Sequence, residues 1–134
     1  MTINYKTLMA RQFAPFTRHY SRAESIHYAR GFGAGMDTEQ AGDDEPWLDP
    51  DNPKALPMMA VALADGEFWQ QDPATGIVWQ KIVHSAESIR VHNPLPPEGS
   101  VVIPQGIKDI FDRGAERGAV MIQEQELSDL QGNP

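Results

Sequence analysis

The spacing of apolar residues predicts one helix near the start of the chain. Ser21 and Glu24 have the S-x-x-E spacing of a capping box, in which each side chain accepts a hydrogen bond from the other residue's backbone N–H. Apolar residues then recur at helical spacing: Ala23, Ile26, Tyr28, Ala29 and Phe32. Three glycines end the helix: Gly31, Gly33 and Gly35. Because this helix would be apolar over much of its girth, we expect it to be largely buried.

Alternation of apolar and polar residues predicts strands on both sides of this helix. One strand is expected at 11–18, and a long β-rich stretch runs over 77–92, where residues 89–92 alternate cleanly. A further strand is expected over 100–112, with an edge or a bulge at Pro104, and a returning strand over 119–127. One helix against a curved antiparallel sheet is an α+β arrangement.

The middle of the chain, residues 37–63, lacks the alternation that predicts strands. Residues 37–53 are acidic and rich in turn-forming residues, and they predict an irregular excursion. Residues 56–63 could form a short helix with Pro57 in its first turn, where a missing N–H costs little.

Composition excludes several classes of function. The chain has 134 residues, with 11 Lys and Arg against 19 Asp and Glu, and a net charge of -8. Nucleic acid and anionic membranes both require clustered basic residues, so neither is an expected partner. No apolar run approaches the roughly 20 residues that span a bilayer. The absence of cysteine excludes disulfides and thiolate chemistry, and no signal peptide is recognisable, so we expect a cytoplasmic protein.

The residues alone contain no strong catalytic motif. The four histidines, at positions 19, 27, 84 and 92, show no helical i,i+3 or i,i+4 pairing, and we expect no metal site. Gly31–Gly35 follows a helix rather than a strand, which favours a helix stop over a phosphate loop. The acidic excursion lacks the spacing of a calcium loop. His84 lies within the predicted strand, either as an ordinary surface histidine or as a functional one.

Five stretches, in order along the chain, resemble one known family. They are Arg18–Gly35, Leu56–Val61, Lys81–Glu87, Asn93–Gly99 and Asp109–Gly114. The second is similar to that family's L-P-T-F-A-V stretch and the third to its V-x-H-G-E-Q. The fourth is similar to R-P-L-P-x-x-G and the fifth to D-V-x-D-K-G. The family is that of the two-domain MaoC-like hydratases, the type-2 (R)-specific enoyl-CoA hydratases, and the resemblance is to their N-terminal half.

This resemblance implies the hot-dog fold, an antiparallel sheet wrapped around one central helix. That fold agrees with the element order read from the residues. Residues 1–134 would form a single N-terminal hot-dog domain. Leu127–Pro134 looks like a hairpin turn, whereas the family continues with another strand, so we expect this hot dog to be truncated before its last strand.

The resemblance also implies a role in holding substrate. The family's catalytic Asp and His lie in a D-x-N-x-x-H motif on the C-terminal hot dog, where they activate water for addition to a trans-2-enoyl thioester. This sequence lacks the motif, and Asp49–Pro53 is only a superficial echo of it without the histidine. We therefore expect no catalytic residue in this chain.

The positions that match the family's contacts to the CoA ester are His84, Ser85 and Arg113. Arg113 could meet a phosphate, while the Ser85 N–H or His84 could contact the pantetheine. Ser85 and Ala86 stand where the family has Gly-Glu, so a close backbone approach there is not assured and substrate preference could differ.

The expected function is thus the substrate-binding half of an (R)-specific 2-enoyl-CoA hydratase, with an acyl-CoA substrate and no cofactor. A second hot-dog domain would supply the catalytic pair, from the same longer chain, from a partner subunit or from a homodimer. Two alternatives stay open. One is an acyl-thioester binding module without a reaction of its own, and the other is a dehydratase half for a short branched or dicarboxylic acyl-CoA.

Overall fold

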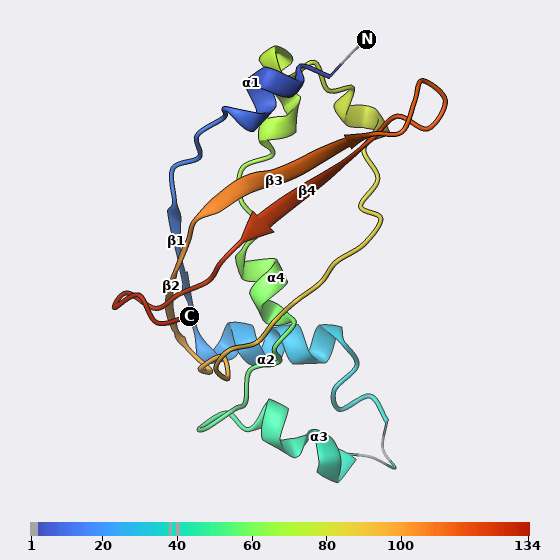
Figure 1. Ribbon diagram of the computed structural model, residues 1–134. Helices are drawn as coiled ribbons and strands as arrows, with labels where there is room; N and C mark the ends of the chain where they lie inside the picture. Colours follow the sequence, from blue (N-terminus) through green and yellow to red (C-terminus); the bar gives the residue numbers. More distant parts are fainter. Residues whose placement is uncertain (1–2, 38, 40) are drawn as a thin grey trace. The chain divides into compact units, whose positions relative to one another are not determined.

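The computed structural model describes residues 3–37, 39 and 41–134. Its helices and strands are labelled in Figure 1. The chain divides into two compact units. The first unit comprises the chain up to Phe16, Gly66–Ser88 and Pro104–Glu126. The second unit comprises Thr17–Asp65, Ile89–Ile103 and Leu127–Pro134.

An antiparallel hairpin is the largest element of the first unit. Strand β3 (Gln105–Asp112) pairs with β4 (Ala119–Gln125), and the register shifts between Ile107 and Asp109. One strand was expected over 100–112 with an edge or a bulge at Pro104, but two strands form there and belong to different sheets, because Pro104 has no N–H to donate between them. The returning strand is confirmed, ending at Gln125 rather than at residue 127.

The rest of the first unit packs around one tryptophan. Helix α1 (Tyr5–Met9) and the 3-10 turns η1 (Trp69–Gln71), η2 (Pro73–Thr75) and η3 (Trp79–Lys81) belong here. The buried side chains are Leu8, Trp69 and Thr75. The Arg11 guanidinium lies 5.2 Å from the Trp69 ring, and its Nη1 is 2.7 Å from Oδ2 of Asp72. This ion pair ties the end of α1 to the η1–η2 turns.

Helix α2 (Arg22–Gly31) organises the second unit, and it begins as the sequence predicts. The Ser21 hydroxyl accepts from the Glu24 N–H at 3.3 Å, and Glu24 Oε2 accepts from the Ser21 N–H at 2.8 Å. Beyond the helix, Gly35 has φ +80°, and a Cβ there would lie 2.9 Å from Cδ1 of Leu48. The positive φ favours glycine here, whereas the end of the Leu48 side chain could shift to make room for a Cβ.

The expectation that α2 is largely buried is wrong. Only Ser25 and Ala29, one turn apart, are buried, while Phe32 is 66% exposed. Among the described residues, the segments that pack on α2 cover only the narrow stripe that contains Ser25 and Ala29. Apolar residues around a helix permit its burial, but burial also requires other segments to pack against each side.

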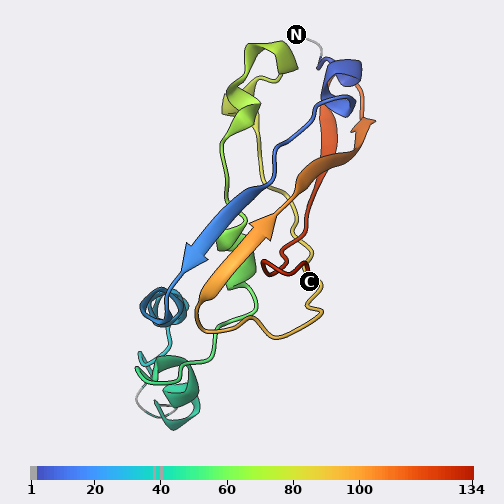
Figure 2. The same cartoon turned by 90° about the vertical axis from the view of Figure 1, so that its left-hand side faces the viewer.

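Two strands and two more helices complete the second unit. Strand β1 (Phe16–Tyr20), whose first residue belongs to the other unit, pairs with β2 (Gly99–Ile103), and their arrows run in opposite directions in Figure 2. Helix α4 (Met59–Leu63) confirms the short helix expected after Pro57. In the C-terminal turn, Ser128 forms an isolated bridge to Val102.

Two predicted segments differ in place or kind. The first strand was expected at 11–18 but begins at Phe16, because Arg11 is engaged by Asp72 and Pro15 has no N–H. Within the excursion expected to be irregular over 37–53, Ala41–Leu48 forms helix α3. Asp43 and Asp44 lie in its first turn, where the helix dipole favours negative charge.

The strand expected over 77–92 is absent from the structure. Trp79–Lys81 forms a 3-10 turn, and residues 82–91 have no regular secondary structure. Alternation shows that a segment can fit a sheet, but a strand also needs an edge with which to pair. The described residues supply no such edge for this segment.

The Arg11–Asp72 pair makes the first unit sensitive to acid. The Arg11 hydrogen bond, aided by the Ala74 N–H, lowers the pKa of Asp72 below its usual value. The carboxylate therefore contributes stability above the pKa of the unfolded chain, about 3.9, and loses it as the pH falls through the lowered native pKa. The difference in unfolding free energy between the native chain and Asp72→Asn should be largest near pH 7 and shrink towards pH 3. Urea titrations at both pH values measure it. Glu116→Gln is the control, since no hydrogen bond of its carboxylate is found in the described chain, and it should show no such trend.

Candidate functional site

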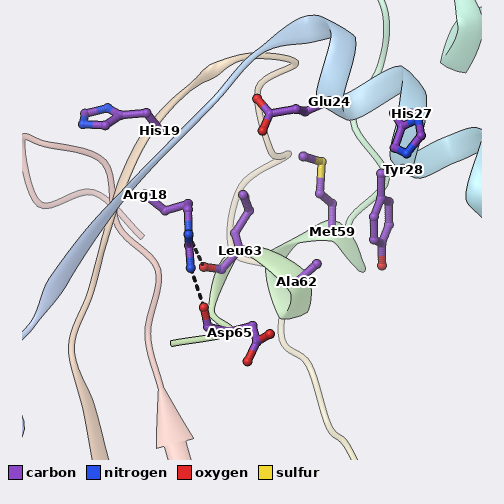
Figure 3. A pocket seen from close by; sticks show the side chains of 9 residues that line it. All are labelled: Arg18, His19, Glu24, His27, Tyr28, Met59, Ala62, Leu63 and Asp65. Atoms are coloured by element: carbon purple, nitrogen blue, oxygen red, sulfur yellow. Dashed lines mark hydrogen bonds between the residues drawn. The ribbon is translucent and has the colours of Figure 1, made fainter. Parts of the chain in front are cut away.

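A surface cavity of about 370 Å³ lies within the second unit, where β1, α2 and α4 meet. Figure 3 shows its lining. The lining residues are Arg18, His19, Glu24, His27, Tyr28, Met59, Ala62, Leu63 and Asp65. Met59 and Leu63 are buried, while most of the polar members are exposed. An apolar floor with a polar rim is a common form of binding pocket for small molecules.

Arg18 fixes one wall of the cavity. Its Nε donates to the carbonyl of Leu63 at 3.4 Å, and its Nη2 donates to the carbonyl of Asp65 (Figure 3). These carbonyls lie at the C-terminal end of α4, where no further turn of helix would satisfy them. Arg18 therefore joins β1 to the end of α4 and keeps the floor in place.

Tyr28 fixes the opposite side. Its hydroxyl donates to the carbonyl of Met58 at 2.9 Å, which joins α2 to the start of α4. Burial raises the pKa of the Tyr28 hydroxyl above its usual value. At neutral pH the Tyr28 hydroxyl is therefore protonated and does not act as a base. Its proton is donated to the Met58 carbonyl.

Glu24 places a negative charge at the first turn of α2. Hydrogen bonds from the Ser21 hydroxyl and backbone N–H lower the pKa of Glu24, so the side chain is ionised at neutral pH. A helix N-terminus is often an anion site, because its N–H groups have no partner within the helix. Here the chain's own carboxylate and hydroxyl occupy that position.

The two histidines of the rim differ in their contacts. His19 points away from the centre of the cavity in Figure 3, and its Nδ1 lies 2.6 Å from Oγ of Ser100. His27 is exposed, one helical turn beyond Glu24. Within the described residues, no group of three or more His, Cys, Asp or Glu side chains could hold a metal ion.

The sequence has relatives of known activity, although no protein-family model matches it. It is 28% identical, over 92% of its length, to the enoyl-CoA hydratase ChsH3 of Mycobacterium tuberculosis. It is 27% identical, over 81% of its length, to 3-hydroxyacyl-thioester dehydratase Y of the same organism. The chain spans 44% and 36% of these two proteins, respectively.

A solved structure matches the fold. One chain of the C-terminally truncated 3R-hydroxyacyl-ACP dehydratase complex HadBC of M. tuberculosis superposes with a TM-score of 0.56. The match covers 92% of this chain and 90% of that one, at 16% sequence identity. The chain is a relative of the MaoC-like hot-dog dehydratases. Its fold is a hot dog with a reduced sheet, as the resemblance implied.

The structure places the three predicted CoA-ester residues of this hot dog in the first unit. His84 and Ser85 lie in the segment that has no regular structure, and Arg113 follows β3. All three are exposed. Nε2 of His84 lies 2.9 Å from Oε2 of Glu87 and 3.1 Å from the carbonyl of Ala86. Among the described residues, no hydrogen bond or ion pair joins these three side chains to one another, so their shared role stays a prediction.

Sequence reasoning missed the cavity residues. Arg18, Glu24 and Tyr28 all lie within the first matched stretch, and Met59 lies within the second. Because both stretches match the same expected domain, their residues could have been expected to lie close together. Nothing in the local pattern showed that Arg18 would hold the end of α4.

We expect Met59 to be the residue on which the cavity floor depends. It is 4% exposed, and its sulfur lies 3.5 Å from the Ser25 hydroxyl oxygen. Met59→Ala should lower the free energy of unfolding by about 2–5 kcal/mol through lost packing, whereas Met59→Leu should cost less than about 1.5 kcal/mol. Chemical denaturation of the three proteins checks both values. Equal stability of the alanine variant would show that Met59 does not support the floor.

Proposed function

We propose that this chain is the substrate-binding half of an (R)-specific 2-enoyl-CoA hydratase. One observation carries the proposal: nearly the whole chain matches an enoyl-CoA hydratase, yet it spans less than half of that protein's length. The remaining half would be a second hot dog that carries the catalytic Asp and His. In this proposal the CoA thioester is the substrate, and no separate cofactor takes part.

The arrangement at the start of α2 supports a role without catalysis. Addition of water to a 2-enoyl thioester places the water oxygen on C3 and a proton on C2, and negative charge develops on the thioester oxygen in between. Stabilising that charge requires free N–H donors or a cation. The first turn of α2 presents the ionised Glu24 instead, and the sequence has no D-x-N-x-x-H motif.

The exposed groups of the first unit support a role in binding the CoA portion. Arg113 offers a guanidinium to a phosphate group, with which arginine can form two parallel hydrogen bonds. His84 and the Ser85 N–H offer partners to the amide groups of pantetheine.

A second function has an observation in its favour. Dehydratase Y acts, by its name, on 3-hydroxyacyl thioesters, which points to the same reaction in the opposite direction. The chain would then hold a 3-hydroxyacyl substrate, including a short branched or dicarboxylic one. A binding module with no reaction of its own differs from both, because no catalytic partner would produce turnover.

The first test uses crotonyl-CoA. Titration calorimetry with this chain alone should give binding, while the absorbance of the enoyl thioester should stay constant. The absorbance should fall when the part of ChsH3 outside the matched region is added. Turnover by the chain alone would contradict the proposal and make His84 or His27 a catalyst. Absence of both binding and turnover would limit the resemblance to the fold.

Two substitutions test the binding residues. His84→Ala and Arg113→Ala should each weaken crotonyl-CoA binding about tenfold, because each removes one polar contact worth about 1.4 kcal/mol. Arg117→Ala is the matched control, since Arg117 is an exposed arginine in the same turn, and it should bind as the native chain does. Unchanged affinity in both test variants would refute this site.

A further inference from the structure

The two ring nitrogens of His84 have different surroundings. Nε2 lies 2.9 Å from Oε2 of Glu87 and 3.1 Å from the carbonyl oxygen of Ala86. Among the described residues, Nδ1 forms no hydrogen bond, and the side chain is 68% exposed. One nitrogen is therefore held by the chain itself, and the other is open to a ligand.

Both neighbours of Nε2 accept hydrogen bonds and donate none. An ionised carboxylate and a backbone carbonyl have lone pairs but no hydrogen. A ring nitrogen within hydrogen-bond distance of two acceptors must carry the hydrogen itself, because a bare nitrogen would turn its lone pair towards theirs. A neutral imidazole has only one N–H. Nδ1 of neutral His84 is therefore a bare acceptor.

The local backbone brings Glu87 within reach of the ring. Residues three apart on a flat strand point to opposite faces, but residues 82–91 have no regular secondary structure. In the part of the chain that the structure describes, the ion pair with His84 is the one contact found for the Glu87 carboxylate. That carboxylate is thus available to fix the ring.

The next peptide group offers a donor beside this acceptor. Ser85 is exposed, and its N–H has no hydrogen-bond partner within the described chain. Nδ1 of His84 and the Ser85 N–H thus present one acceptor and one donor. A secondary amide has one N–H and one C=O, which match this pair, whereas an ionised phosphate oxygen can only accept. The pair therefore favours an amide over a phosphate group.

We propose that Glu87 is a positioning residue that holds His84 in the Nε2–H form, so that Nδ1 accepts a hydrogen bond from an amide N–H of pantetheine. This inference rests on the proposed function and names the atom that receives the substrate. Glu87 acts through the ring and does not touch the ligand. Its effect is modest, because Glu87 is 44% exposed and ion pairs between exposed groups contribute little.

The position of the ring hydrogen can be measured on the free chain, without a ligand. Nitrogen NMR of the chain with labelled histidine distinguishes a protonated ring nitrogen from a bare one, and His84→Ala identifies the signals by their loss. At pH 8 the native chain should show a protonated Nε2 and a bare Nδ1. Glu87→Ala should increase the share of His84 with its hydrogen on Nδ1.

Two further variants separate positioning from a general effect of the substitution. Glu87→Gln should restore the native signals, because its amide oxygen still accepts from Nε2. Glu116→Ala, which removes an exposed carboxylate from the β3–β4 turn, should leave the signals unchanged. Identical His84 signals in the native chain and Glu87→Ala would overturn the role of Glu87.

N-methylated ligands test the acceptor. Methylation of a pantetheine amide removes its N–H and keeps its carbonyl. In calorimetry, methylation of one of the two amides should weaken binding of crotonyl-pantetheine to the native chain about fivefold, and it should have no effect on binding to His84→Ala. Equal losses with and without His84 would overturn the contact.

A pair of substitutions links Glu87 to the same contact. Glu87→Ala should weaken crotonyl-CoA binding about threefold in the native chain but should not change it in His84→Ala. An equal loss in both backgrounds would show that Glu87 does not act through the ring. Absence of crotonyl-CoA binding to the native chain would refute the proposed function and the amide contact, whereas the imidazole signals would still decide the role of Glu87.

Discussion

One hydrogen bond, made by a fully buried hydroxyl, links three parts of the second unit. The Ser25 hydroxyl, fully buried on α2, donates to the carbonyl of Pro97 at 2.7 Å and also contacts the sulfur of Met59. A single side chain thereby links α2 to α4 and to the turn that leads into β2. A buried hydroxyl without a partner is costly, so this contact favours the observed position of α2. The cavity lies between α2 and α4, which this contact joins, and Tyr28 and Arg18 fix its two ends.

Local rules of sequence predicted those elements whose cause is also local. The capping box at Ser21 and the short helix after Pro57 depend on neighbouring residues alone, and both are found where expected. Two expectations are wrong: that α2 is largely buried, and that 77–92 forms a strand. Both would require a partner segment that is distant in the sequence. Helix α3 was missed because its acidic first turn reads equally well as a solvated loop.

The same division applies to the candidate site. Resemblance to a family directed attention to His84, Ser85 and Arg113, which are exposed and share no direct contact among the described residues. The cavity depends instead on Arg18 reaching the end of α4 and on Tyr28 reaching its start, at sequence separations of 45 and 30 residues. Contacts over such distances leave no mark on local periodicity. Only the folded chain brings these residues together.

The tryptophans give the two units separate optical reporters. Trp69 is buried beside the Arg11 guanidinium in the first unit, whereas Trp47 lies in α3 of the second, 5.9 Å from the Lys54 ammonium. Trp79, also in the first unit, is 38% exposed and already in contact with solvent. The fluorescence emission of Trp69 therefore reports on the packing of the first unit. The emission of Trp47 reports on the contact of α3 with Lys54. Removing the Trp47 indole would let the melting of the first unit be followed alone, whereas the second unit would require the removal of both Trp69 and Trp79.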